Sequence, residues 1–229
     1  MAGSISIRRS IRWLPGDASE PTSTIVLTSP QRQFVDLRIL KDGDTIQGLQ
    51  DQLPLSRLDW AIAGTSSSST RTINGEQVCH SRWDHWVSSR TDQPDKASDE
   101  GDMYPQPDGS TLEIGSMVNP DTGRDTPYEE IWDDEDPQPT TSEQVCAVLK
   151  YEDGKERGMV VRLGRYCQGI LKTSSNMSLE RWEWQDLRAV RTVRIGSEEL
   201  PCGESLTRVY KLGEEVTIGS KKWTVVEVA

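Results

Sequence analysis

Short segments of alternating polar and apolar residues, separated by turn residues, recur along most of the chain and constrain its fold more than any other feature. Asn74-Gly75 lies between two such segments, and an Asn-Gly pair tolerates the positive φ angles of a type I′ hairpin turn. Gly219-Ser220 separates two further segments in the same way. Convincing helical periodicity is scarce. The pattern therefore predicts an all-β protein of short antiparallel strands arranged in sandwiches or barrels.

The acidic residues are concentrated in one stretch. Residues 92–143 hold 16 acidic and 2 basic side chains and seven of the 12 prolines, although the net charge of the whole chain is only −11. Like charges and prolines oppose packing and favour a solvated connector. We therefore expect an N-terminal β-barrel at 1–120 and a C-terminal β-barrel at 144–229. An acidic, proline-rich connector at 121–143 would join them, and a further flexible loop is expected at 92–110.

Composition excludes several classes of function. No run of 18 apolar residues is present, so we expect no membrane-spanning helix. A chain this acidic is a poor partner for nucleic acid, because phosphate contact needs a cationic surface. The start of the chain carries three arginines and no acid, which fits a transit peptide, but Ile5 and Ile7 alternate with serines as in a first strand. The four scattered cysteines favour reduced, mostly buried thiols.

Catalytic and metal-binding patterns are weak. The only two histidines lie in one segment, where Cys79, His80 and His85 could be considered as metal ligands. On an unbroken strand His80 faces away from the other two, so the three could converge only through a bulge. Phosphate-binding glycine motifs and a GxSxG nucleophile elbow are absent. We therefore predict no metal, no cofactor and no catalytic residue.

Eight tryptophans stand against a single phenylalanine. Packing at the ends of barrels would account for them, since tryptophan buries a large apolar area while its N–H is satisfied at a rim. The alternative is an aromatic-lined pocket for an apolar ligand. The residues predicted to line such a pocket are Trp60, Trp83, Arg165, Trp182 and Trp184.

Five segments, in order along the chain, carry a family resemblance. Residues 59–65 (DWAIAGT) are similar to an acidic-Trp-Ala-x-Ala-Gly-Thr element, and residues 164–171 (GRYCQGIL) to a Gly-Arg-aromatic-x-Gln-Gly-x-Leu strand. Further matches lie at 104–105, 130–132 and 219–227. Together they resemble the fungal Hri-one family, which is named for a yeast protein that interacts with the casein kinase I of that organism.

The resemblance implies two calycin-like, lipocalin-like β-barrels, a cytoplasmic and nuclear location, and no known reaction. It supports a non-enzymatic interaction protein that binds a casein kinase I-type protein kinase. Two alternatives stay open: a carrier of a small apolar ligand in a barrel pocket, and a barrel-fold isomerase or cyclase of secondary metabolism.

An acidic run precedes three hydroxyl residues in the expected connector. Such a run can be held by the basic surface of a casein kinase I-type enzyme, and prolines would keep the segment extended and accessible. The run predicted to dock the kinase is Asp133, Asp134, Glu135 and Asp136. The phosphorylation sites predicted after it are Thr140, Thr141 and Ser142.

Overall fold

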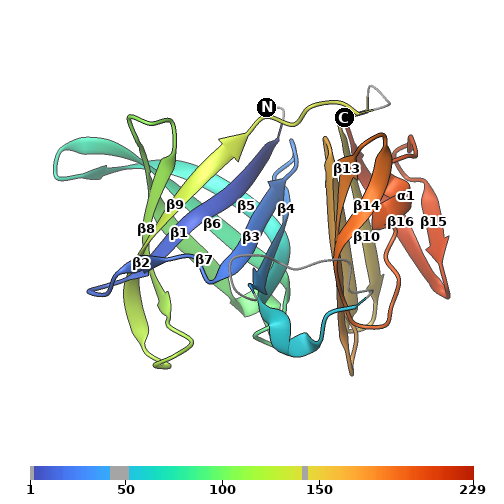
Figure 1. Ribbon diagram of the computed structural model, residues 1–229, viewed down its shortest axis with the longest axis horizontal. Helices are drawn as coiled ribbons and strands as arrows, with labels where there is room; N and C mark the ends of the chain where they lie inside the picture. The colour runs from blue at the N-terminus through green and yellow to red at the C-terminus, as the bar shows by residue number, and fades with distance from the viewer. Residues whose placement is uncertain (1–2, 42–51, 141–143) are drawn as a thin grey trace.

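A computed structural model describes residues 3–41, 52–140 and 144–229, and these residues form two antiparallel β-sheets (Figure 1). The first sheet contains β1 (Ser4–Trp13), β2 (Ala18–Ser19), β3 (Thr22–Thr28), β4 (Gln33–Leu40), β5 (Leu58–Ile73), β6 (Glu76–Ser88), β7 (Ser98–Pro105), β8 (Thr111–Val118) and β9 (Asp125–Glu135). The second contains β10 (Cys146–Asp153), β11 (Glu156–Leu163), β12 (Tyr166–Lys172), β13 (Met177–Gln185), β14 (Arg188–Ile195), β15 (Glu215–Ile218) and β16 (Lys221–Val228). Helical segments are short: 3₁₀ turns η1 (Leu55–Arg57) and η2 (Pro94–Lys96), and helix α1 (Cys202–Ser205).

The first sheet closes into an eight-stranded barrel. Strands β1 and β3–β9 pair in sequence, and β9 returns to pair with β1, so these described strands form a closed ring. The predicted Asn-Gly hairpin is confirmed: it joins β5 to β6, with φ of 51° at Asn74 and 88° at Gly75. The two-residue strand β2 pairs with the second half of β1, on the edge of β1 that faces β3 and not on the edge that faces β9.

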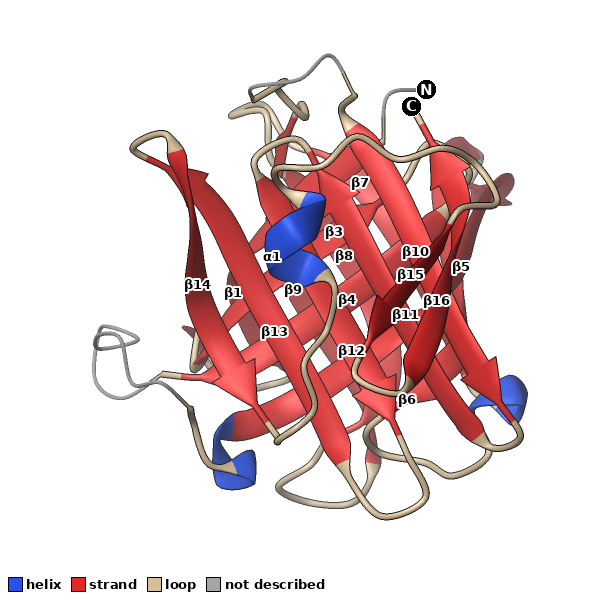
Figure 2. Ribbon diagram, turned by 90° about the vertical axis from the view of Figure 1, so that its right-hand side faces the viewer, coloured by secondary structure: helices blue, strands red, loops and turns tan. Residues whose placement is uncertain are grey.

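The second sheet is open in the described residues. Its strand order is β14-β13-β12-β11-β10-β16-β15, and no described pairing joins the two ends. The predicted Gly219-Ser220 hairpin is confirmed between β15 and β16. The prediction of a second closed barrel is wrong, because the segment between β14 and β15 forms α1 and loops that cover one face of the sheet instead of pairing with its edges (Figure 2).

The acidic stretch is largely part of the barrel. Residues 98–105 form β7 and residues 125–135 form β9, so the expected flexible loop at 92–110 and connector at 121–143 are wrong over these strands. The inward acid Glu130 is paired with arginines from other strands. Counting charges along the sequence does not reveal ion pairs between distant strands. The acidic stretch was therefore wrongly predicted to be a solvated connector.

The main apolar core lies between the two sheets. Every second residue of β4, including Val35, Leu37 and Ile39, points out of the barrel and packs against the second sheet. Facing residues such as Val161 and Ile170 complete this layer. In Figure 1 the second sheet stands edge-on beside the barrel wall formed by β3 and β4.

Two buried polar residues tie the sheets together across this layer. The Gln168 amide of β12 donates to the carbonyls of Ile25 and Val35 on the barrel, at 2.9 and 3.1 Å. The Arg181 guanidinium of β13 donates to Gln168 Oε1 at 2.7 Å and to the carbonyl of Leu37 at 2.8 Å. Burial lowers the pKa of Arg181 to about 10, so it remains charged at neutral pH. These bonds fix how the second sheet sits on the barrel wall.

Candidate ligand-binding site in the barrel

The strands of the barrel wall send a second, different set of side chains into the lumen. On β4, Phe34, Asp36 and Arg38 alternate with the outward apolar residues and point inward, where all three are buried. The lumen therefore receives charged groups from a strand that also supplies the main apolar core.

A buried charged cluster fills the deep part of the lumen. Arg8 of β1 donates to Glu130 at 2.5 Å and to Glu20 at 2.8 Å. Arg38 donates to Asp36 at 2.9 Å and to the same Glu130 at 3.2 Å. Two guanidinium groups thus bind three carboxyl groups, and the pairing offsets much of the cost of removing these charges from water.

A cavity of about 190 Å³ extends from this cluster toward one end of the barrel. On β1, Ser4 and Ser6 line it and Arg8 lies further along the same face. The aromatic side chains that line the cavity are Phe34, Trp83, Tyr128 and Trp132. The charged side chains that line it are Arg32, Asp36, Arg38, Asp99, Glu113 and Asp134. The lining therefore combines flat apolar surfaces with ionisable groups.

Glu113 of β8 is the most unusual group in this lining. Its Oε1 accepts a hydrogen bond from the Tyr128 hydroxyl at 2.6 Å, and its Oε2 accepts one from Trp132 Nε1 at 3.0 Å. Burial, together with the nearby charge of Glu130, raises the pKa of Glu113 to about 8. A carboxyl group that is largely neutral at pH 7 and ionises just above it can respond to the charge of whatever enters the lumen.

Two glycines make room for Glu113 and its partner. Gly101 of β7 and Gly115 of β8 face each other in the sheet. A Cβ atom at Gly101 would lie 2.6 Å from Glu113 Cγ, and one at Gly115 would lie 2.5 Å from the Tyr128 hydroxyl oxygen. A larger residue at either position would displace the Glu113–Tyr128 pair, so both positions need glycine for this pair to form.

A histidine on β6 and an aspartate on β7 meet beside strand β8, which carries Glu113. His85 Nε2 lies 3.0 Å from Asp99 Oδ2, and the His85 ring meets Trp60 edge-on with 5.9 Å between centroids. His85 is buried, and its Nδ1 has no hydrogen-bond partner among the described residues. Asp99 lines the cavity, whereas Trp60 lies behind it with the Arg38 and Arg90 guanidinium groups over its ring.

Serines surround the mouth of the cavity. Ser66, Ser67 and Ser68 of β5 line it there, together with Ser81 of β6. Asp134, at the end of β9, is exposed and accepts a hydrogen bond from Ser6 at 2.5 Å. The serine run that begins at residue 66 is thus part of the rim through which a ligand would enter.

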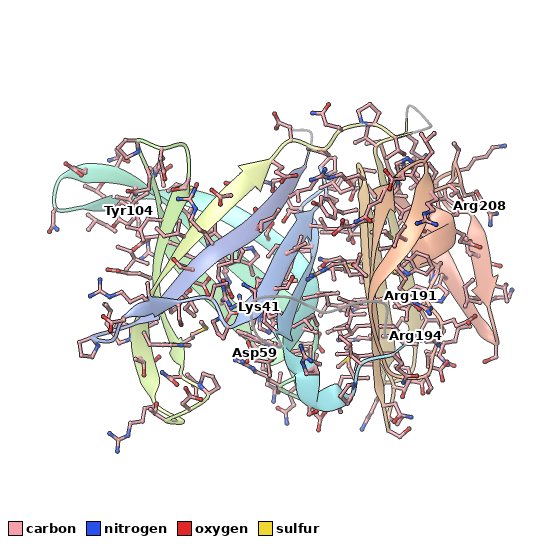
Figure 3. The ribbon with its side chains drawn as sticks, viewed as in Figure 1. Lys41, Asp59, Tyr104, Arg191, Arg194 and Arg208 are labelled. Carbon is pink, nitrogen blue, oxygen red and sulfur yellow. The ribbon has the colours of Figure 1, made fainter. Side chains whose placement is uncertain are left out.

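The five residues predicted to line a pocket do not converge. Trp83 lines the barrel cavity, and Trp60 is packed in the barrel core behind it. Trp182 and Trp184 lie on β13 and pack with the apolar cluster under α1, on the far side of the second sheet. Arg191, labelled in Figure 3, lies over the Trp182 ring at 5.5 Å. The shared pocket is therefore wrong, because the five residues belong to two sheets.

Arg165 has a different position from the one predicted. It lies with Gly164 in the two-residue turn between β11 and β12, about half exposed. Its guanidinium donates to Glu135 at 3.2 Å and to the Tyr166 hydroxyl at 2.9 Å. Arg165 therefore links the turn to the end of β9 and does not line a pocket with the tryptophans.

The acidic run is divided between ion pairs and solvent. Asp133 pairs with Arg9 and Glu135 with Arg165, whereas Asp134 and Asp136 are exposed. Of the hydroxyl residues predicted as phosphorylation sites, Thr140 is half-buried and accepts a hydrogen bond from Arg162 at 3.3 Å. The other two, Thr141 and Ser142, lie outside the described residues.

Comparisons with known proteins place the chain in a family. The sequence model of the family described as Protein HRI1 matches residues 4–227. The chain belongs to the HRI1 family. No curated protein matches it. The crystal structure of an uncharacterized protein, YLR301w, from Saccharomyces cerevisiae is similar over 100% of both chains, with a TM-score of 0.78 and 19% sequence identity. That similarity supports the fold alone.

The described residues contain neither a membrane-spanning helix nor a cluster of metal ligands. Over residues 3–41, 52–140 and 144–229, no helix is long and apolar enough to cross a membrane. Within the same residues no three His, Cys, Asp or Glu side chains are grouped as metal ligands would be. Cys79 is exposed on β6, whereas His85 on the same strand points into the lumen.

Sequence reasoning missed the residues that now define the site: Asp36, Arg38, Glu113 and Glu130. Asp36 and Arg38 did carry a signal, since they alternate with Val35 and Leu37 on a strand whose other face is wholly apolar. Alternation alone does not say whether the polar face meets solvent or a lumen.

Proposed function

We propose that this HRI1-family protein binds a small molecule in the lumen of its closed barrel. The observation that carries the proposal is the cavity of about 190 Å³, which is lined by aromatic rings and by the buried carboxyl groups of Asp36 and Glu113. Concave sites with an apolar lining and a few convergent polar groups are the usual form of small-molecule sites. An engineered cavity of roughly 150 Å³ holds benzene, so the lumen is large enough for a one-ring ligand.

The lining refines the carrier hypothesis drawn from the sequence. A purely apolar ligand would leave Asp36 and Glu113 without new partners, at a cost for each buried polar group. The better ligand has a flat or apolar body against Trp83 and Trp132 and a polar group that reaches the carboxyl groups. An eight-stranded antiparallel barrel with one ligand-sized lumen is the lipocalin arrangement, and on that ground we propose a calycin-like relationship for the first barrel.

The test is a thermal-shift screen of one-ring compounds, with a blocked lumen as the control. Met117 and Val118 are neighbours on β8: Met117 lines the cavity, and Val118 is 59% exposed on the outer face. We expect compounds that raise the melting temperature of the natural protein and of Val118→Trp, but not of Met117→Trp. A screen without such compounds, or compounds that stabilise all three proteins equally, would refute lumen binding.

Binding of a casein kinase I-type protein kinase, in cytoplasm or nucleus, is a second proposal and rests on the family resemblance. The structural observation that favours it is that Asp134 and Asp136 remain exposed ahead of Thr140. Phosphosite mapping with a fungal casein kinase I should show modification near Thr140 that weakens when Asp134 and Asp136 become asparagines. Equal modification of both proteins would exclude a role for these acids.

A further inference from the structure

Negative charge exceeds positive charge in the lining of the barrel cavity. Four carboxyl groups and two guanidinium groups line it, and one of these guanidinium groups, that of Arg38, is bonded to Asp36 and Glu130. The other, Arg32, lies half-buried toward the mouth. Glu113 accepts hydrogen bonds from the neutral donors Tyr128 and Trp132. The lining therefore holds more carboxyl groups than guanidinium groups, and the hydrogen bonds to Glu113 bring no positive charge to it.

Asp36 shows directly that a hydrogen-bond donor is missing. Its side chain is 5% exposed, its Oδ2 accepts from Arg38 at 2.9 Å, and its Oδ1 has no hydrogen-bond partner among the described residues. Asp36 also lines the cavity. Burying a carboxylate oxygen without a hydrogen-bond donor costs free energy. A ligand N–H that donated to Oδ1 would remove this cost, and that gain would add to the affinity for the ligand.

The aromatic side chains provide the second half of the argument. Phe34, Trp83 and Trp132 line the same cavity as the carboxyl groups. Aromatic faces carry negative partial charge and attract organic cations, most strongly where water is excluded. An excess of carboxyl groups over guanidinium groups and aromatic faces around one cavity favour the same kind of ligand.

We propose that the lumen selects a small organic cation, a protonated amine on a one-ring body, over neutral and anionic molecules of the same size. This inference rests on the proposed function, because it names the class of ligand that the barrel binds. The ammonium group would lie between Asp36 and Glu113, and its ring would lie against Trp83 and Trp132.

Binding of a cation should also be linked to the ionisation of Glu113. That side chain faces Tyr128 and Glu130 on β9 and is influenced by Arg38 on β4, while β7 presents Gly101 and, further along its inward face, Asp99. Burial and Glu130 raise its pKa to about 8, so a bound cation would lower that pKa and release a proton near pH 7. Affinity for the cation should therefore rise between about pH 6 and pH 8.

Three probes of equal size test the inference: benzylamine, benzyl alcohol and benzoate. Isothermal titration calorimetry at pH 7 should give benzylamine a dissociation constant at least about tenfold below those of the other two. Repeating the benzylamine titration in buffers of different ionisation enthalpy should show net proton release. Tighter or equal binding of benzyl alcohol or benzoate would overturn the cation preference and leave lumen binding intact.

The matched variants are Glu113→Gln, inside the barrel, and Glu129→Gln, whose residue lies opposite Ile114 on the outer face. Glu113→Gln should abolish proton release and reduce the preference for benzylamine about tenfold, whereas Glu129→Gln should change neither.

If Glu113→Gln fails to fold, Asp134→Asn at the mouth replaces it and should lower benzylamine affinity. Failure of all three probes to bind at about 5 mM, while the screen still yields lumen ligands, would overturn the inference alone. Absence of lumen ligands in the screen would overturn the proposed function as well.

Discussion

Gln168 is predicted to hold the two sheets together, and Gln168→Met tests this with little change in side-chain shape. The substitution removes two donated bonds, to the carbonyls of Ile25 and Val35, and one bond accepted from Arg181. A neutral buried hydrogen bond contributes about 0.5–1.5 kcal/mol, and a bond to a charged group about 1.5–3 kcal/mol. Arg181 would also keep its charge in an apolar layer with one fewer acceptor. We therefore expect a loss of about 3–5 kcal/mol in the free energy of unfolding.

Urea denaturation and a thermal scan measure this loss. At this chain length each kcal/mol shifts the melting temperature by about 2–4 °C, so Gln168→Met should melt about 10 °C lower, in a single transition. The control is Gln185→Met: that residue is exposed at the end of β13 and its side-chain amide donates to Glu183, so the change should stay within about 0.5 kcal/mol. A loss below about 1 kcal/mol for Gln168→Met would refute the reasoning.

Three further predictions follow from single sites. Gly164→Ala should lower the free energy of unfolding, measured by urea denaturation, by more than about 1 kcal/mol, because φ there is +56° and a Cβ would lie 2.8 Å from the carbonyl oxygen of Gln138. Gly154→Ala is the control for the cost of the backbone conformation, since φ there is +59° and no described atom lies within 4 Å of an added Cβ; equal losses in the two variants would exclude a contribution from the contact with Gln138. Folded Glu113 holds its proton up to about pH 8, whereas the unfolded chain loses it near pH 4.5, so the free energy of unfolding should fall as pH rises between these values. Glu113→Gln should flatten this fall, and an unchanged slope in that variant would contradict the raised pKa of Glu113. Only Cys79 among the four cysteines is exposed, so a thiol reagent should label one site in the native protein and four after unfolding, and native labelling of two or more would contradict the packing.

The features that the sequence could predict are local ones. Asn74-Gly75 and Gly219-Ser220 mark hairpins because a turn and its two flanking strands are adjacent in the chain. Strand alternation likewise predicts an all-β fold and an apolar face on β4, but not that this face points out of the barrel. Gly164 begins the strand that the resemblance implies at 164–171, but it lies in the turn before β12, where it makes the close backbone approach that glycine permits.

Features that depend on pairing between distant residues could not be predicted. The barrel closes through pairs such as Arg8 with Trp132, more than 120 positions apart, and no local pattern fixes that register. The acidic stretch looked unpackable because its counter-charges, such as Arg9 for Asp133, come from the first strand. The family resemblance indicated barrels but could not show that the second sheet stays open or which wall meets it.

The contents of the lumen are hard to explain by stability alone. Replacing a buried ion pair with well-packed apolar side chains often leaves protein stability unchanged or raises it, because removing charged groups from water costs a large amount of free energy. The cluster formed by Arg8, Arg38 and Glu130 offsets that cost by mutual pairing. Asp36 Oδ1 and Glu113 do not share fully in that pairing, and the raised pKa of each carboxyl group records the cost of its burial. A ligand that supplies positive charge and N–H donors would reduce the cost of burying Asp36 and the cost of burying Glu113. Ligand binding in the barrel therefore accounts for two carboxyl groups that stability alone does not explain.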